Sequence, residues 1–274
     1  MEKKTFLQRV PFLDSLLIAF VVTVSFALLS SVINFAVSLV VSGYPSNNYG
    51  IVGLLCAAVV VIGFYHWMHK DFKGFLNGGN MTLGFKLCVP FLIYIAVSHI
   101  CSVIVGEPMN FGGITFKVIT TSLYAGISEE IVFRGYVIPG LMKDRLNASD
   151  YRPVVIISAV VFGLFHALNI FAGANVLRTL LQVVEAGLIG VYFAVVYIRS
   201  GNLLPLMLLH AFNDILAIGF APDVAETGVI QGGLNAMSFI DLGLCIVIAI
   251  VGLKLLNDAE VSDIRQLWAD LWHR

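Results

Sequence analysis

The sequence predicts an all-α fold, a polytopic membrane bundle of about eight transmembrane helices. Of the 274 residues, 59% are hydrophobic and only 12% are charged, whereas soluble domains have roughly 45–50% apolar and about 25% charged residues. The mean hydropathy is +0.93. The apolar runs are about 17–30 residues long, which fits helices across a hydrocarbon core of about 30 Å and not the short alternating strands of a barrel.

The predicted spans lie at about 13–42, 50–67, 84–105, 117–142, 152–171, 176–199, 202–219 and 238–256. The first follows a basic N-terminus, as in a signal peptide, but its apolar stretch runs to about Val41, well beyond a signal core of 7–15 residues. The tail, VSDIRQLWADLWHR, mixes aromatic and charged residues as interfacial helices do. We therefore predict one integral membrane domain over residues 1–274, without a soluble domain.

Lysine and arginine predict the orientation. Most of them fall before the first span, in the even-numbered loops or after the last span, while only Lys117 and Arg178 lie on the opposite side. The positive-inside rule then places both termini in the cytoplasm. The net charge of −1 gives no basic excess that would suggest binding to nucleic acid. The apolar composition makes membrane lipids the expected surroundings. The four cysteines are scattered without metal-binding spacing, and we interpret them as packing residues.

Ionisable residues recur at depth on four of the predicted helices. A charge near the bilayer centre costs at least about 2.5–3.5 kcal/mol, so it faces a partner or a water-filled cavity. Counted from the predicted cytoplasmic ends at 1.5 Å per residue, Glu129, His166 and Glu185 lie about 20 Å deep and His210 about 14 Å deep. The sequence therefore predicts a shared cavity, and we expect it to open toward the cytoplasm.

Spacing within each helix suggests which of these residues pair with one another and which stay free. Residues four apart share a helix face, so Glu130 can pair with Arg134 while Glu129 points about 100° away. Phe162 lies one turn from His166 on the same basis, and His210 shares a face with Asn213 and Asp214. A free carboxylate and an imidazole could deprotonate a water, and a second imidazole with an amide or a protonated acid could stabilise an oxyanion.

At these residues the sequence resembles the CPBP family of intramembrane proteases, also called the Abi or CAAX-protease family. Its motifs EExxxR, FxxxH and HxxxN/D stand here as EEIVFR (129–134), FGLFH (162–166) and HAFND (210–214). The three motifs occur in order on separate spans, and the resemblance covers about residues 115–220. It implies an eight-helix endopeptidase fold whose members cleave prenylated CAAX proteins or, in bacteria, process peptides or confer bacteriocin immunity.

The resemblance also implies roles for individual residues. Glu129 and His166 would activate the water, and His210 with Asp214 would form the oxyanion site. Glu130 and Arg134 would hold the site in shape. The family's usual last motif residue is Asn, so Asn213, beside Asp214, is an alternative oxyanion donor. The resemblance favours metal-free chemistry without a cofactor, in a bacterial cell membrane, on a peptide or a prenylated or otherwise lipidated protein.

Other interpretations stay open at this point. The EEIVFR residues could form a structural ion-pair cluster, His166 and His210 could be packing histidines, and Glu185 could serve the cavity or only a structural hydrogen bond. Two histidines and a glutamate could bind zinc, although no HExxH helix is present. A non-catalytic immunity or regulatory scaffold of the same fold is the main alternative to an enzyme, and a proton-coupled transporter is a third. No motif specifies the substrate.

Overall fold

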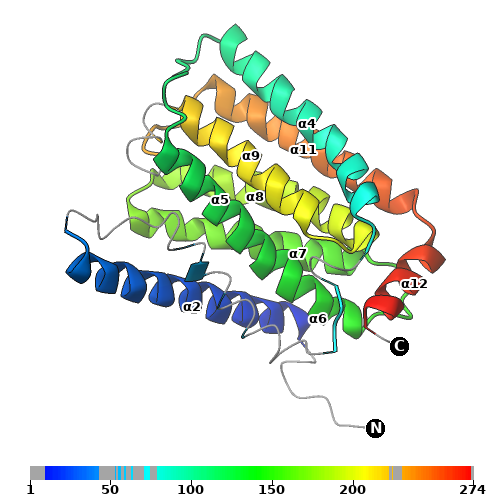
Figure 1. Ribbon diagram of the computed structural model, residues 1–274. Helices are drawn as coiled ribbons and strands as arrows, with labels where there is room; N and C mark the ends of the chain where they lie inside the picture. Colours follow the sequence, from blue (N-terminus) through cyan, green and yellow to red (C-terminus); the bar gives the residue numbers. More distant parts are fainter. Residues whose placement is uncertain are drawn as a thin grey trace.

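The computed structural model describes residues 10–42, 71–74, 79–221 and 230–272, with the single positions Gly53, Leu55, Cys56, Val59, Gly63 and Val224. All regular structure in this part is helical, so the predicted all-α class is confirmed. The long helices run side by side, and the short C-terminal helix lies at an angle to them at one end of the bundle (Figure 1). The predicted span at 50–67 lies almost wholly outside the described residues.

Long apolar helices form most of the bundle. α2 (Pro11–Val40), α4 (Met81–Ile104), α8 (Val176–Ser200) and α11 (Ala236–Asn257) each have the length and apolar character of a membrane span, as does the stretch Arg152–Ala172. α9 (Leu204–Phe220) is apolar but shorter, with 17 residues. Among the described residues, five helical stretches therefore have the length and apolar character of a span, and the predicted count of eight stays a prediction.

The predicted span at 117–142 is one continuous helical rod of three parts. α5 (Phe116–Glu130) passes into the π-helical segment η1 (Ile131–Val137), which passes into α6 (Ile138–Lys143). The span at 152–171 likewise has two parts, α7 (Arg152–Phe165) and the 3-10 segment η2 (His166–Ala172). In both rods the change in helix type falls at or directly after motif residues.

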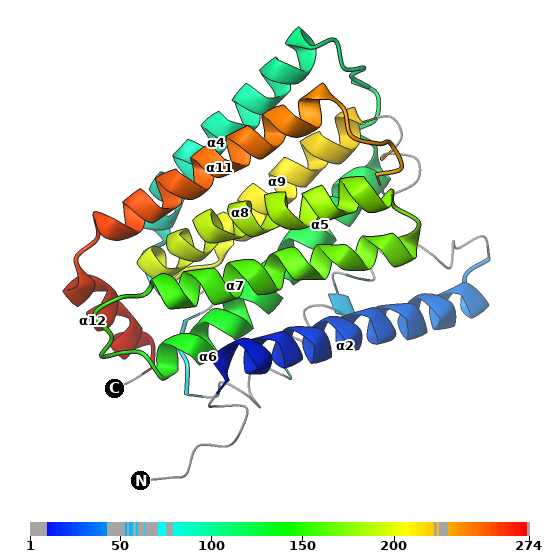
Figure 2. The ribbon, with the colours of Figure 1, turned by 180° about the vertical axis from the view of Figure 1, so that it is seen from behind.

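The packing order brings the three motif helices together. α7 packs on α8, α5 on α9, and α8 on α11, while α4 covers α9 and α11, and α2 lies along η1 and α7. Figures 1 and 2 show α4 with α11 at one side of the bundle and α2 at the other. α5, α7, α8 and α9 therefore form the interior between these outer helices.

The two ends of the bundle differ. One end carries the start of α2, the loop at 143–152 and α12 (Val261–Leu271), the expected interfacial helix of the tail. α12 buries Ile264, Trp268 and Leu271 against the bundle, and the Trp268 indole N–H donates to the Ile198 carbonyl at 2.8 Å. We call this the α12 end, and the opposite end, which carries residues 105–115, 173–175 and 230–235, the loop end.

Candidate active site

The predicted site residues line one cavity of about 880 Å³. Its walls include Glu129 from α5, His166 from η2, Glu185 from α8, and His210 and Asp214 from α9. The prediction that separate helices bring polar groups to a shared cavity is confirmed. Phe162 and Asn213 lie in the same wall, while Glu130 and Arg134 are fully buried beside it.

The expected opening toward the cytoplasm does not agree with the predicted orientation. The described lining residues run from the middle of the bundle to the loop end, and they include Glu107 and 230–233. None of them comes from the loop at 143–152, the turn at 200–204 or α12, within the described part of the chain. The depth was counted from one end only, and His166 is six residues from the end of its helical rod at Ala172. The cavity therefore lies on the side opposite the α12 end.

A buried charged network joins two of the motifs. Arg134 Nη1 donates to Glu130 Oε1 at 2.8 Å, which confirms the pair predicted from the i, i+4 spacing. The same oxygen lies 2.8 Å from His210 Nδ1. A carboxylate oxygen only accepts hydrogen bonds, so Nδ1 carries the proton in this contact. Glu130 thus fixes the orientation of the His210 ring across 80 positions of sequence.

Aromatic rings enclose the arginine and the histidines. The Arg134 guanidinium lies 4.3 Å from the Phe162 ring centroid and 5.3 Å from that of Phe193, within the range of cation–π attraction. Arg134 Nε and Nη2 have no hydrogen-bond partner among the described residues. The two aromatic rings are therefore the partners that the structure shows for this part of the guanidinium. The Phe162 ring also meets the rings of His166 at 4.8 Å and His210 at 6.1 Å, edge to face. The Phe162 ring therefore packs against the Arg134 guanidinium and against both imidazole rings.

Local backbone features bring these side chains close together. An added Cβ at Gly126 would lie 2.5 Å from the backbone nitrogen of Ala211, so the glycine permits α5 and α9 to meet one turn before the glutamates. The π-helical segment follows directly, and the Ser158 hydroxyl of α7 donates to the Phe133 carbonyl within it at 3.1 Å. Such segments often occur at functional sites. Here it contains the whole turn that presents Arg134.

The side of His210 that faces the cavity is less tightly paired. His210 Nε2 lies 3.6 Å from Asp214 Oδ2 and 3.8 Å from Glu129 Oε2, both longer than a hydrogen bond. Glu129 Oε2 has no hydrogen-bond partner among the described residues. Asn213 Nδ2 donates to Asp214 Oδ1 at 3.4 Å. On its cavity side, His210 Nε2 is therefore flanked by two carboxylates without a hydrogen bond to either.

His166 lines the same cavity, but among the described residues no ion pair within 4.0 Å joins its ring nitrogens to the Glu129 carboxylate. Its Nδ1 lies 3.1 Å from the carbonyl oxygen of Phe162, one turn earlier. That carbonyl only accepts, so Nδ1 carries the proton and Nε2 is the free nitrogen. The structure therefore brings His210, rather than His166, nearest to Glu129.

A second polar group in the cavity wall has a weaker signal in the sequence. Arg178 Nη1 donates to Glu185 Oε2 at 2.6 Å, and both residues lie on the cavity face of α8. Nearby, Ser98 donates to Asp241 Oδ1 at 2.8 Å. The sequence predicts Glu185 as a supporting residue, whereas Arg178 is noted there only as one of two basic residues on the side opposite the predicted cytoplasmic side. The spacing of seven residues, two helical turns, is the signal that could have paired them.

The described residues contain no group of three or more His, Cys, Asp or Glu side chains arranged to hold a metal ion. His210 Nδ1 donates to Glu130, so only Nε2 of this ring faces the cavity.

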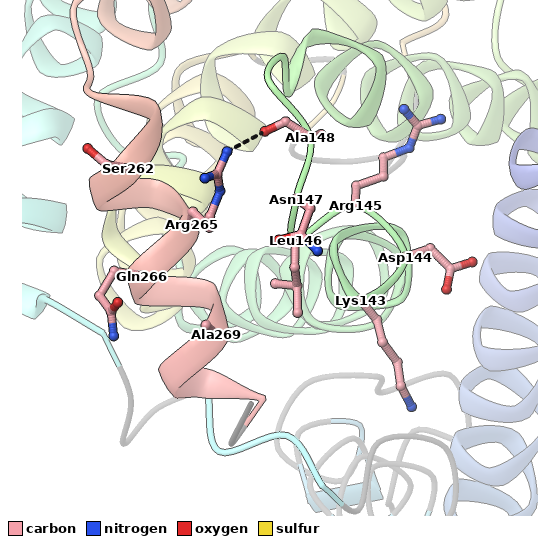
Figure 3. A pocket seen from close by; sticks show the side chains of 10 residues that line it. All are labelled: Lys143, Asp144, Arg145, Leu146, Asn147, Ala148, Ser262, Arg265, Gln266 and Ala269. Carbon is pink, nitrogen blue, oxygen red and sulfur yellow. Dashed lines mark hydrogen bonds between the residues drawn. The ribbon is translucent and has the colours of Figure 1, made fainter.

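A second cavity, of about 860 Å³, lies at the α12 end and is separate from the motif residues. It is formed by residues 143–148 and one face of α12 (Figure 3). Arg265 Nη2 donates to the Ala148 carbonyl at 3.5 Å, which links the two walls. Its charged residues are Lys143, Asp144, Arg145 and Arg265, so this cavity is basic where the other is acidic.

Fold and site together define a helical membrane protein with a buried glutamate, histidine and arginine constellation. A family model described as Rce1-like, type II CAAX prenyl endopeptidase Rce1-like, matches residues 111–216. This stretch contains all three motifs, and the resemblance predicted from them is confirmed. No curated protein and no solved structure matches the chain.

Proposed function

We propose that this protein is an intramembrane endopeptidase that hydrolyses a peptide bond in a lipid-tethered or membrane-embedded substrate, with a water activated by Glu129 and His166. The observation that supports it best is the arrangement around His210. Glu130 and Arg134 hold the ring from the buried side, and on the cavity side Glu129 Oε2 makes no hydrogen bond among the described residues. A purely structural ion-pair cluster has no need for a free carboxylate in a cavity of this size.

In the proposed reaction, one proton moves from the water through Glu129 to the leaving amine. The Glu129 carboxylate accepts a proton from water, the oxygen adds to the substrate carbonyl carbon, and the proton later passes to the leaving amine. Because His210 Nδ1 donates to Glu130, this ring can donate from Nε2 to an oxyanion only as an imidazolium. The carboxylates of Glu129 and Glu130 on either side of the ring are the partners that such a cation needs.

The test compares Glu129→Gln and His166→Ala with wild type in membranes, by peptidomics and with a farnesylated CAAX peptide. Both changes should abolish cleavage while the bundle stays folded, because each removes half of the pair that activates water. Asp150→Asn is the matched control, since it makes the same kind of change at an exposed position of the α12 end. Retention of a tenth of the activity by either variant would contradict the assignment.

The same preparation distinguishes the alternatives. A scaffold without activity would give identical peptide profiles for wild type and Glu129→Gln. Cleavage that EDTA or phenanthroline removes and zinc restores would establish a metalloprotease. Proton-dependent uptake in proteoliposomes that Glu129→Gln removes would favour a transporter. We expect cleavage that persists in the presence of chelators.

A further inference from the structure

Arg178 is the one lysine or arginine among the described residues that line the large cavity. Its side chain is 14% exposed, and it uses Nη1 for the contact with Glu185. A guanidinium has five N–H donors in a planar fork. The remaining Arg178 donors are absent from the buried groups that lack a partner, so they face the accessible space of the cavity.

The acidic residues of the cavity wall affect where an anionic group can bind. Five acidic side chains line the described wall, namely Glu107, Glu129, Glu185, Asp214 and Asp241. An anionic group that enters is repelled along most of this wall and attracted at Arg178. Glu185 holds the guanidinium from one side, and Asp241 is held by Ser98. Away from the imidazolium proposed for His210, a bound carboxylate would thus have one favourable position, on the open donors of Arg178.

The distance along α8 between Arg178 and the level of His210 can be compared with the length of an extended peptide. The face of α8 toward the cavity carries Phe193, whose ring lies 5.8 Å from that of His210, and then Glu185 and Arg178 toward the loop end. Phe193 lies fifteen residues, about 22 Å along the helix axis, from Arg178, and an arginine side chain covers at most about 7 Å of that distance. The remaining distance of about 15 Å corresponds to four or five extended peptide residues at about 3.3–3.6 Å each. A carboxylate at Arg178 would therefore belong to a chain end about four or five residues beyond a bond at His210.

We propose that Arg178 binds the C-terminal carboxylate of the substrate and so sets the distance between the cleaved bond and the chain end. This inference rests on the proposed endopeptidase function and adds a specificity-determining residue to it. The peptide then lies with its C-terminus toward the loop end.

The test uses the full-length protein and two farnesylated peptides that differ only in a free C-terminal carboxylate or a C-terminal amide. The readout is the ratio of the kcat/KM values for acid and amide. We expect wild type to favour the acid about ten- to hundred-fold, as for a charge-assisted hydrogen bond. Arg178→Gln should bring the ratio close to one. Arg199→Gln, at the other end of α8 and outside the cavity, is the control that should keep the ratio.

A further variant guards against a folding defect. Arg178→Gln leaves the Glu185 charge buried without its partner, so the double variant Arg178→Gln/Glu185→Gln removes both charges together. It should also lose the preference, whereas Glu185→Gln alone should keep it. Equal cleavage of the two peptides by wild type, or a preference retained in the double variant, would overturn the role of Arg178 alone. Cleavage of neither peptide by wild type would overturn the proposed function as well.

Discussion

The two ends of the bundle use charge in opposite ways. At the loop end, the charges lie inside, where the large cavity has five acidic residues and one arginine in its described wall. At the α12 end, the basic residues Lys143, Arg145 and Arg265 line the second cavity (Figure 3). Arg152 and Asp150 there form a loose pair at 3.8 Å, with both side chains about half exposed.

The two groups of charges bear on different properties of the protein. The basic residues at the α12 end are spread over several segments and predict the orientation in the membrane by the positive-inside rule. The interior charges are few, paired and close to one another, and they bear on chemistry. Since the cavity lies at the less basic end, the predicted orientation would expose it to the outer compartment. A substrate that reaches the site from the cytoplasm would require the opposite orientation.

Cysteine labelling tests the comparison most directly, with an all-or-none result. In a variant without the four native cysteines, Lys143→Cys and Ser262→Cys mark the α12 end. Gly232→Cys marks the loop end, where an added Cβ has no neighbour within 4 Å. We expect a membrane-impermeant maleimide to label the first two positions only from the cytoplasmic side and Gly232→Cys only from outside. The reverse pattern would contradict the predicted termini and place the cavity on the cytoplasmic side.

The buried network should give the next largest effect. Glu130→Gln and Arg134→Ala each leave a charge buried without its partner, which costs about 3–5 kcal/mol of folding free energy. We expect lower yield and a lower midpoint of thermal unfolding together with lost activity. Arg152→Gln, which breaks the exposed pair at the other end, should change stability by less than about 1 kcal/mol. Normal stability of both network variants would show that the pair does not support the fold.

The contact of α5 with α9 should give a smaller loss. Gly126→Ala places a methyl group 2.5 Å from the Ala211 backbone nitrogen, so the helices must separate at the level of the site. Overpacking of this kind costs about 1–3 kcal/mol. Activity should fall further than stability, because Glu129 and Glu130 would move away from His210. Gly243→Ala in α11, where an added Cβ meets nothing, is the control, and equal behaviour of the two variants would refute the close approach.

The sequence predicted those parts of the site that depend on local spacing. The Glu130–Arg134 pair and the Phe162–His166 contact follow from residues four apart on a helix, and both are present. The contact between Glu130 and His210 joins two helices, and no periodicity shows which oxygen faces which nitrogen. The cavity side was missed for a similar reason, because depth from one end does not determine the distance to the other. The π-helical segment and Phe193 also depend on how neighbouring helices pack.

The last prediction concerns Asp214 and has the smallest expected effect. An ionised aspartate only accepts hydrogen bonds, so Asp214 can stabilise an oxyanion only when it is protonated. Its Oδ2 lies 3.6 Å from His210 Nε2, too far for a hydrogen bond, while Oδ1 accepts from Asn213. Both the protonated-donor role and a role in orienting His210 by charge are therefore compatible with the geometry.

Asp214→Asn separates these two roles, because an amide donates at every pH. If the acid is a protonated donor, the wild type loses activity as rising pH ionises Asp214. The amide should then retain activity within a few-fold and extend it to higher pH. If Asp214 orients His210 through its charge, the same change should lower activity at every pH. We expect the first result, and Asn213→Ala should then lower activity less than Asp214→Ala, because Asn213 would only support its neighbour. A pH–rate profile of Asp214→Asn that lies below wild type throughout would instead assign the donor role to Asn213, with Asp214 as the charge that holds His210 in place.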